Sequence, residues 1–364
     1  MLSLMYRGLF LASFLVALAD WDRANGGQMA NGTIFFSAVF DPGQESDVYS
    51  IRPDGTTLQN LTSDFNQPAQ DPVVSPDGKL VAFGSPHNGN QIWVMNLDGS
   101  NKRAIPLASE PYGPSLGGWL NNSTLLYYSG PGPGMGLLRR IDLDGSNPST
   151  LVRGPLSGDF DLGMEASFSS SAGWIAFDGQ AGSWSPSYDI WIAQADGSQA
   201  RLFYADPDDD TIDRNPVWSR DGKTLYWNRG VTTGYQHPLG LIVQKSLGST
   251  SGTASFDAVV RHSDGLSAYV TACSPDDTTL LFIRDGKALV KYVLATKQEI
   301  VISQASAIGS ADWAAADTEI DEQSSVPIIN ALWATQEVFV GGQATFRVFA
   351  DGMPAPTFRW RFNG

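Results

Sequence analysis

The sequence predicts an all-β protein: a six-bladed β-propeller followed by part of an immunoglobulin-like β-sandwich. Three observations carry this prediction. The 364 residues include 38 glycines, 21 prolines and an aromatic content of 11%, which favours many short strands joined by tight turns. A four-strand motif recurs about every 48 residues, the period of propeller blades. The copies at the two ends of the repeat region are incomplete and complementary.

The repeat is clearest over residues 71–100. An apolar strand leads into the turn Ser75–Gly78, and a second strand follows this turn. The third strand is Gln91–Met95, and the turn Asp98-Gly99 separates it from the fourth strand. Asp-Gly between apolar runs predicts a tight hairpin, because such turns need residues that tolerate positive φ. Four strands per unit are typical of a propeller blade. The later turns of the copies begin at Asp54, Asp98, Asp144 and Asp196, with weaker counterparts at Leu247 and Ala295.

Packing and closure of the ring follow from the same repeat. The N-terminal copy begins at Asn31-Gly32 and supplies three strands, whereas the C-terminal copy supplies only Ser310–Ala314. Joined, they make one blade, which closes the ring and leaves no open sheet. We therefore expect a propeller over residues 29–316. One apolar position recurs in the first strand of each copy: Val74, Trp119, Phe168, Trp218, Cys273 and Trp313.

The Ser-Pro-Asp-Gly-Lys turn, Ile92-Trp93-Val94-Met95 and Asp98-Gly99-Ser100 resemble the TolB-like (WD40-like) β-propeller repeats of exported bacterial proteins. The resemblance covers about 290 residues, with two or three well-defined blades. It implies a fold rather than a reaction, because this fold hosts partner-binding proteins, lyases and gating domains of proteases.

Residues 1–19 predict a signal peptide. Arg7 precedes an apolar run of about ten residues, and Ala17-Leu18-Ala19 has the small-x-small pattern of a cleavage site. This run is too short to span a bilayer, which takes about 20 residues; a buried N-terminal strand or helix is the alternative. We expect export to the periplasm, the cell surface or the medium, with no transmembrane span.

After the repeats the composition changes. Residues 317–326 are acidic and polar and predict a linker. Residues 327–364 look like the first half of an immunoglobulin-like domain, with Trp360 in the place of the buried strand-C tryptophan and Val348 where many members have a cysteine. Since such a sandwich needs about seven strands, we expect a longer gene product. A short β-extension docked on the propeller is the alternative.

The long insertions of the repeats fall on one predicted face, and function concentrates in such loops on a rigid scaffold. First-strand positions at this end are expected to surround the mouth of the central funnel and to bind a ligand, or simply to hold water. The polar ones are Asp71, Glu165, Asn215 and Ser310.

Two groups of residues are candidate metal ligands. Carboxylates in one loop alternate as in a calcium site, although Thr211 and Val217 stand where an EF-hand has Gly and Glu; an ordinary charged loop is the alternative. These are Asp206, Asp208, Asp210 and Asp213. Three imidazoles suit a transition metal, and the repeats also resemble propeller-fold pectate-fragment lyases, which use a histidine-bound metal. These are His87, His237 and His262.

The formal net charge of −15 argues against nucleic acid as a partner, because phosphate binding needs clustered Lys and Arg. One cysteine, Cys273, excludes an internal disulfide framework. We expect an exported, monomeric, non-catalytic binding scaffold without a cofactor, whose long-loop face contacts a protein or an envelope glycan. The alternative is a carbohydrate-active lyase or hydrolase with calcium or another divalent metal on the same face.

Overall fold

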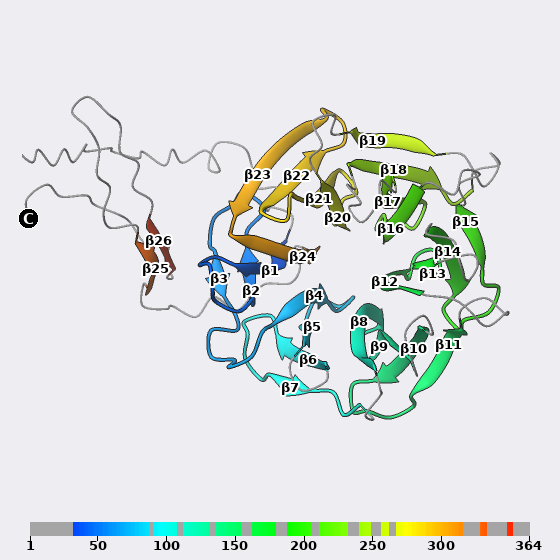
Figure 1. The fold of residues 1–364 in the computed structure, drawn as a ribbon, viewed down its shortest axis with the longest axis horizontal. Helices are drawn as coiled ribbons and strands as arrows, with labels where there is room; N and C mark the ends of the chain where they lie inside the picture. The colour runs from blue at the N-terminus through cyan, green and yellow to red at the C-terminus, as the bar shows by residue number, and fades with distance from the viewer. Residues whose placement is uncertain are drawn as a thin grey trace, which may run out of the picture. The chain divides into compact units, whose positions relative to one another are not determined.

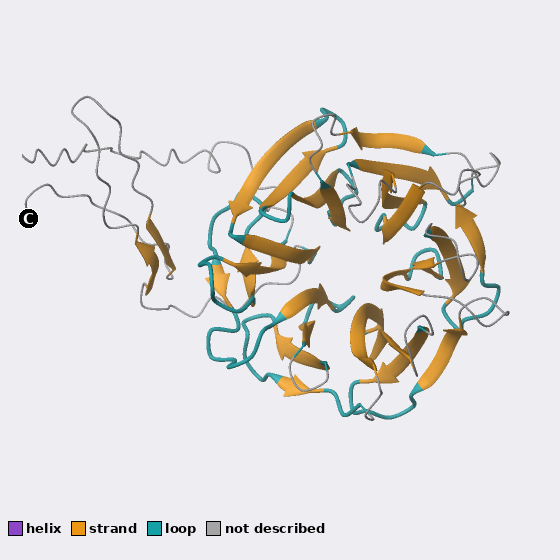
Figure 2. Cartoon of the chain, in the orientation of Figure 1, coloured by secondary structure: helices purple, strands orange, loops and turns teal. Residues whose placement is uncertain are grey.

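The computed structural model describes residues 32–86, 90–107, 112–130, 136–153, 162–179, 188–204, 211–231, 240–248, 256–261, 267–315, 328–332 and 348–351. Every regular element in these ranges is a β-strand (Figure 2). Backbone contacts divide the chain into two units, Ala30–Ile320 and a second unit formed by Met1–Met29 with Asp321–Gly364. The first unit holds six four-stranded sheets arranged as a ring (Figure 1).

The six sheets are the predicted blades, and the first strand named in each is its innermost strand. Blade 1 contains β24 (Ala307–Trp313), β1 (Ile34–Val39), β2 (Asp47–Ile51) and β3 (Gln59–Asn60). Blade 2 contains β4 (Gln70–Val74), β5 (Leu80–Ser85), β6 (Gln91–Asn96) and β7 (Arg103–Ala104). Blade 3 contains β8 (Tyr112–Asn121), β9 (Thr124–Gly130), β10 (Leu137–Asp142) and β11 (Ser149–Arg153).

The other three blades have the same order. Blade 4 contains β12 (Leu162–Ser169), β13 (Trp174–Gly179), β14 (Asp189–Gln194) and β15 (Arg201–Tyr204). Blade 5 contains β16 (Thr211–Trp218), β17 (Thr224–Val231), β18 (Leu241–Ser246) and β19 (Asp257–Arg261). Blade 6 contains β20 (Ala268–Cys273), β21 (Thr279–Arg284), β22 (Ala288–Val293) and β23 (Gln298–Gln304).

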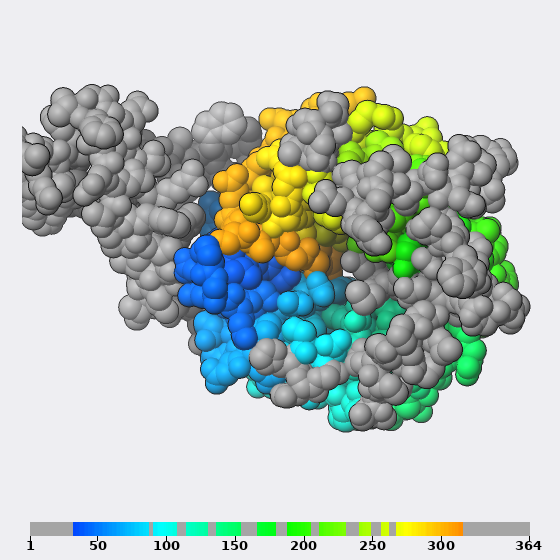
Figure 3. Space-filling model, in the orientation of Figure 1, coloured from blue at the N-terminus to red at the C-terminus, as the bar shows by residue number. Residues whose placement is uncertain are grey.

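Blade 1 is built from both ends of the repeat region, as the sequence predicts. β24 pairs antiparallel with β1, so that Trp313 lies opposite Ile34 and Ala311 opposite Phe36. In Figure 3 the dark blue N-terminal residues of the propeller accordingly lie beside the orange C-terminal ones. The six innermost strands contact one another in the cyclic order β24, β4, β8, β12, β16 and β20.

The apolar core lies between the blades. Six clusters of buried side chains each join two adjacent blades. Alternation within β1 places Phe35 against blade 2 and Phe36 against blade 6. The predicted apolar column is confirmed by the register: each member lies opposite an aliphatic residue of the second strand. The pairs are Val74–Val81, Trp119–Leu125, Phe168–Ile175, Trp218–Leu225, Cys273–Leu280 and Trp313–Ile34.

The turns between the first and second strands of blades 2, 5 and 6 share one hydrogen-bond pattern. In blade 2 the Ser75 hydroxyl donates to Asp77 and accepts from the Leu80 amide, and the Gly78 amide donates to the Ser75 carbonyl. Blades 5 and 6 repeat these bonds at Ser219 and Ser274. The turns leave the blades at one end, which we call the turn face. Connections between second and third strands, such as Phe40–Ser46, leave at the opposite end, the long-loop face.

The turns between third and fourth strands join neighbouring blades. The aspartate caps its own turn, as where Asp98 Oδ1 accepts from the Ser100 amide at 2.9 Å. The following glycine packs against the outer strand of the preceding blade. A Cβ on Gly197 would lie 2.1 Å from the Leu151 carbonyl oxygen, and φ of Gly197 is +83°. Gly55, Gly99 and Gly145 make equivalent approaches, so Asp-Gly at these turns serves both backbone geometry and blade packing.

One arginine connects several blades at the turn face. Arg220, between β16 and β17, donates to the Cys273 carbonyl of blade 6 at 3.4 Å and to the Trp313 carbonyl of blade 1. Its guanidinium also lies 3.6 Å from Asp312. Asp312 in turn accepts from the Val74 amide of blade 2 at 2.9 Å. Charged and polar contacts therefore extend across blades 5, 6, 1 and 2.

In the second unit, β25 (Ile328–Leu332) pairs antiparallel with β26 (Val348–Asp351). β26 overlaps the end of the alternating segment that we expect to form a strand of an immunoglobulin-like domain. That domain remains a prediction. Trp360, the predicted linker and the predicted signal peptide lie outside the described residues.

Candidate functional site

The innermost strand of every blade is interrupted by a bulge or register shift. The shifts lie between Gln70 and Val73 in β4 and between Arg214 and Val217 in β16, and in β24 two residues, Gly309 and Ser310, oppose one residue of β1. β8, β12 and β20 have corresponding irregularities. A bulge changes the direction of the side chains around it. These irregularities encircle the centre of the ring.

All four residues predicted for the funnel mouth fall at these shifts. Asp71, Asn215 and Ser310 lie within the bulges of β4, β16 and β24. Glu165 lies in the shifted segment of β12, and its side chain is outside the described part of the structure. The sequence thus predicts four equivalent positions on the innermost strands. Their role in binding remains a prediction.

Asp71 and Asn215 share a backbone conformation that non-glycine residues seldom adopt. Their φ angles are +52° and +58°, and each is followed by a proline that is buried. Asp and Asn tolerate this left-handed conformation better than most residues. In the cyclic order of innermost strands, two strands separate β4 from β16 in either direction. The two strained residues therefore lie on opposite sides of the ring.

Asp71 carries a negative charge into the ring. Its side chain is exposed, although it belongs to an innermost strand, so it faces the ring centre. Surrounding protein disfavours the charged form and raises the pKa of Asp71, an effect opposed by a hydrogen bond with Ser310. No basic side chain of the described residues adds to this balance.

On the opposite side of the ring, the side-chain amides of Asn215 and Asn228 are hydrogen-bonded to each other. Asn228 is fully buried in β17. Its Nδ2 donates to Asn215 Oδ1 at 3.1 Å, and its Oδ1 accepts from the Val270 amide at 2.9 Å. This side chain therefore fixes the Asn215 bulge and joins blade 5 to blade 6.

A second group of polar residues lies between blades 4 and 5, toward the long-loop face. Asp213 is completely buried, accepts from Trp227 Nε1 at 2.7 Å and lies 3.8 Å from Arg229 Nη1. Burial, with the nearby charge of Asp189, raises the pKa of Asp213 to about 8. A carboxyl that titrates near neutrality is the kind of group that acid–base chemistry uses.

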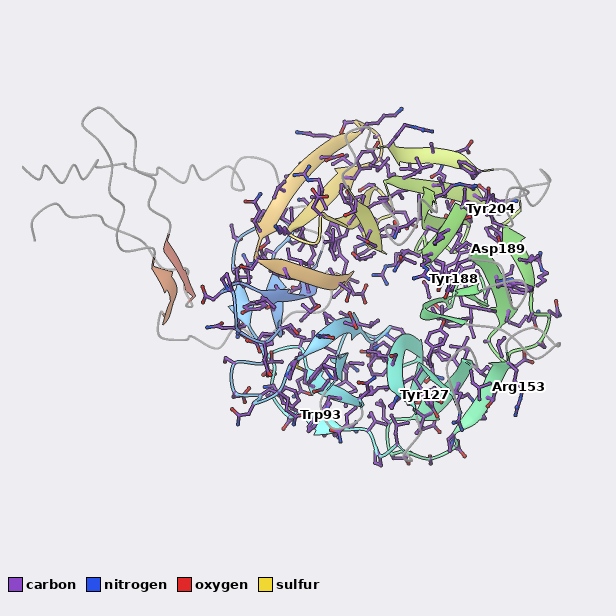
Figure 4. All side chains as sticks on the ribbon, in the orientation of Figure 1. Trp93, Tyr127, Arg153, Tyr188, Asp189 and Tyr204 are labelled. Atoms are coloured by element: carbon purple, nitrogen blue, oxygen red, sulfur yellow. The ribbon has the colours of Figure 1, made fainter. Side chains whose placement is uncertain are left out.

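Aromatic rings surround the arginines of this cluster. The Arg214 guanidinium lies 3.8 Å from the ring centre of Tyr188, and Arg229 lies over Tyr204 and donates to its hydroxyl. Figure 4 labels Tyr188, Asp189 and Tyr204 together on blade 4. Of this cluster the sequence analysis identifies only Asp213. Asp189 and Tyr204 stand at strand ends beside long insertions, and that position was the available signal in the sequence.

The structure describes one of the candidate metal ligands, Asp213. β16 begins at Thr211, so Asp213 is a strand residue inside the blade 4–5 cluster. Asp206, Asp208 and Asp210 lie outside the described residues, as do His87, His237 and His262. Within the described ranges, no three His, Cys, Asp or Glu side chains are grouped so that they could hold a metal ion. The two metal sites remain predictions.

The six closed four-stranded blades define the class: the chain is a six-bladed β-propeller with a TolB-like fold. TolB from Acinetobacter baumannii superposes with a TM-score of 0.56 at 15% identity, covering 78% of this chain and 66% of TolB. A nidogen/laminin complex also gives a TM-score of 0.56, at 10% identity over 77% of this chain and 98% of the matched chain.

An oligogalacturonate lyase in complex with manganese gives a TM-score of 0.47 at 13% identity, covering 75% of this chain and 74% of that one. At 15% and 10% identity, the likenesses to TolB and to the nidogen/laminin complex establish the fold alone. No family model and no curated protein matches the sequence. In the described part of the chain, no helix has the length and hydrophobicity needed to span a membrane.

Proposed function

We propose that the chain is an exported, non-catalytic binding scaffold that holds a protein or an envelope glycan at the long-loop face and the centre of its propeller. One observation carries the proposal: Asp71 and Asn215, on opposite innermost strands, both have strained backbones. Such strain persists where the surrounding fold enforces it, and it clusters at functional sites. A rigid ring with six packed interfaces is suited to this role.

The comparisons support a protein as the partner class. TolB has the same fold, and another match is a complex of two proteins, nidogen and laminin. Export rests on the signal-peptide pattern of residues 1–19 and is consistent with the TolB-like fold. The charge of −15 favours a partner with a basic surface, since complementary potentials speed association.

Site-specific photo-crosslinking in cells that express the full chain tests this proposal. A photoreactive residue at Gln44, in the loop between β1 and β2, probes the long-loop face; one at Lys79 probes the turn face. Both residues are exposed. We expect a discrete crosslinked partner from position 44 and none from position 79. Crosslinks from position 79 alone, or none from either position, would contradict the proposal.

The alternative, a carbohydrate-active lyase or hydrolase, is favoured by the buried Asp213 with its pKa of about 8. Incubation of the purified chain with acidic and neutral oligosaccharides, with and without added Ca²⁺ or Mn²⁺, tests it directly. Turnover that is lost in Asp213→Asn would establish an enzyme and overturn the scaffold proposal. We expect no product in either condition.

A further inference from the structure

We propose that the ring centre binds a basic group of its partner, the ammonium of a lysine or the guanidinium of an arginine, through Asp71. This inference rests on the proposed function and names the chemistry of the bound group. Asp71 is an exposed carboxylate on the innermost strand of blade 2. Its φ angle is +52°, a left-handed backbone conformation that non-glycine residues seldom adopt.

The charge of Asp71 has no counterpart in the described ring. Asp312, the acidic residue of β24, lies 3.6 Å from Arg220 and accepts from the Val74 amide. Asp213, further along the ring, lies 3.8 Å from Arg229. Asp71 has only a hydrogen bond with Ser310. A cationic group from outside would complete an ion pair there in surroundings that weaken solvent screening.

The ligand set at Asp71 fits an organic cation better than a metal ion. The described oxygens are one carboxylate and the Ser310 hydroxyl, which donates its hydrogen to that carboxylate. Calcium takes about 6–8 oxygen ligands. An ammonium or guanidinium needs only a few acceptors, which the free lone pairs of one carboxylate supply.

The propeller also offers a matched comparison within itself. Asn215 occupies the corresponding bulge of blade 5, with nearly the same φ of +58° and the same following proline. Asp71→Asn thus places in blade 2 the residue that blade 5 already accommodates. Asn215→Asp does the reverse, and its carboxylate would still accept from Asn228 Nδ2. Both variants are expected to fold, and they change the charge of the ring centre in opposite directions.

The test measures binding of a blocked Gly-Lys-Gly peptide to the purified full chain by ligand-observed NMR. The same peptide with an acetylated lysine removes the positive charge. We expect Asp71→Asn to weaken binding of the lysine peptide about 3- to 10-fold and Asn215→Asp to strengthen it by a similar factor. Asp257→Asn, at an exposed carboxylate that begins the outer strand β19, makes the same change in net charge and should leave binding within about 2-fold.

The pH dependence gives a second readout. Binding should weaken as the pH falls from about 7 to about 4, because protonation of Asp71 removes the ion pair; Asp71→Asn should lack this dependence. Equal effects of Asp71→Asn and Asp257→Asn would overturn the inference, as would equal binding of the acetylated peptide. Stronger displacement by Ca²⁺ than by lysine would assign the site to a metal instead. The crosslinking experiment depends on none of these outcomes, so the scaffold proposal can fail or stand separately.

Discussion

Asp213 shows how one side chain takes its properties from elements far apart in the sequence. Its strand, β16, places it under Trp227 Nε1 and beside Arg229, while Asp189 comes from the neighbouring blade. Burial and the charge of Asp189 disfavour the charged carboxylate, whereas the hydrogen bond from Trp227 favours it. Burial is the largest effect, and the pKa of Asp213 rises to about 8. Asp213 therefore couples the blade 4–5 interface to pH.

Stability should fall as the pH rises between about 4 and about 8, because the folded chain keeps a proton on Asp213 that the unfolded chain releases. This contribution is fully present below the unfolded pKa and is lost as the pH passes the folded pKa of about 8. Asp213→Asn keeps an acceptor for Trp227 and removes the titration. Denaturant unfolding of both proteins across this range should therefore show that the difference between their free energies of unfolding changes by up to about 1.4 kcal/mol per pH unit. If the two free energies change with pH in parallel, Asp213 is not the source of the pH dependence.

The third-to-fourth-strand hairpin is the element that sets the distance between blades. Its glycine combines a left-handed backbone with close contact to the preceding outer strand, as Gly197 does with Leu151. The bulge of that outer strand, between Thr150 and Val152, brings the Leu151 carbonyl toward the turn. Such bulges and covering turns also limit pairing at the free edge of each blade.

Gly197→Ala should destabilise the propeller by about 3 kcal/mol, because it adds a clash with Leu151 to the cost of the left-handed backbone. Gly43→Ala separates the two effects, since Gly43 has φ of +93° and nothing within 4 Å of an added Cβ. We expect this control to lose about 1 kcal/mol. Chemical denaturation of the two variants measures the difference. Equal losses would mean that backbone strain alone requires glycine at position 197.

At the scale of the whole molecule, ring closure depends on more than the pairing of β24 with β1. Arg220 and Asp312 connect the turn faces of blades 5, 6, 1 and 2, and the Arg220 and Asp221 amides donate to Asp277 of blade 6. These contacts extend over both sides of the closing blade. Their loss should act chiefly on blade 1, because that blade alone is assembled from two distant segments.

Arg220→Ala should lower the free energy of unfolding by about 1–2 kcal/mol and raise amide hydrogen exchange in β1 and β24 more than in β9 and β10. Arg220→Lys keeps the charge without the planar fork and should be intermediate. Lys223→Ala, in the same turn, removes an exposed lysine that pairs with Asp221 and should change stability by less than about 0.5 kcal/mol. Uniform exchange changes across all blades would count against a specific role in closure.

The fold could be predicted because its repeated features are local in sequence. Serine, aspartate and glycine at fixed offsets specify the turns, and one apolar position per copy, from Val74 to Trp313, specifies the packing column. The site was less accessible to prediction. The left-handed backbone of Asp71 has no signature beyond the residue type, and the cluster around Asp213 joins strand ends whose proximity only the ring geometry determines. The repeat predicts the four funnel-mouth positions on the innermost strands. It does not predict which side chains surround the charged groups at these positions.

Closure of blade 1 by β24 also imposes an order in time. β1 to β3 are made first, but the strand that covers the inner edge of β1 ends at Trp313. Until that strand is available, the edge of β1 has no partner from its own blade, and the contacts that complete the ring span almost the entire propeller sequence. Pairings of this range fold slowly. A chain emerging N-terminus first must therefore keep its earliest strands from pairing elsewhere until its last blade strand arrives.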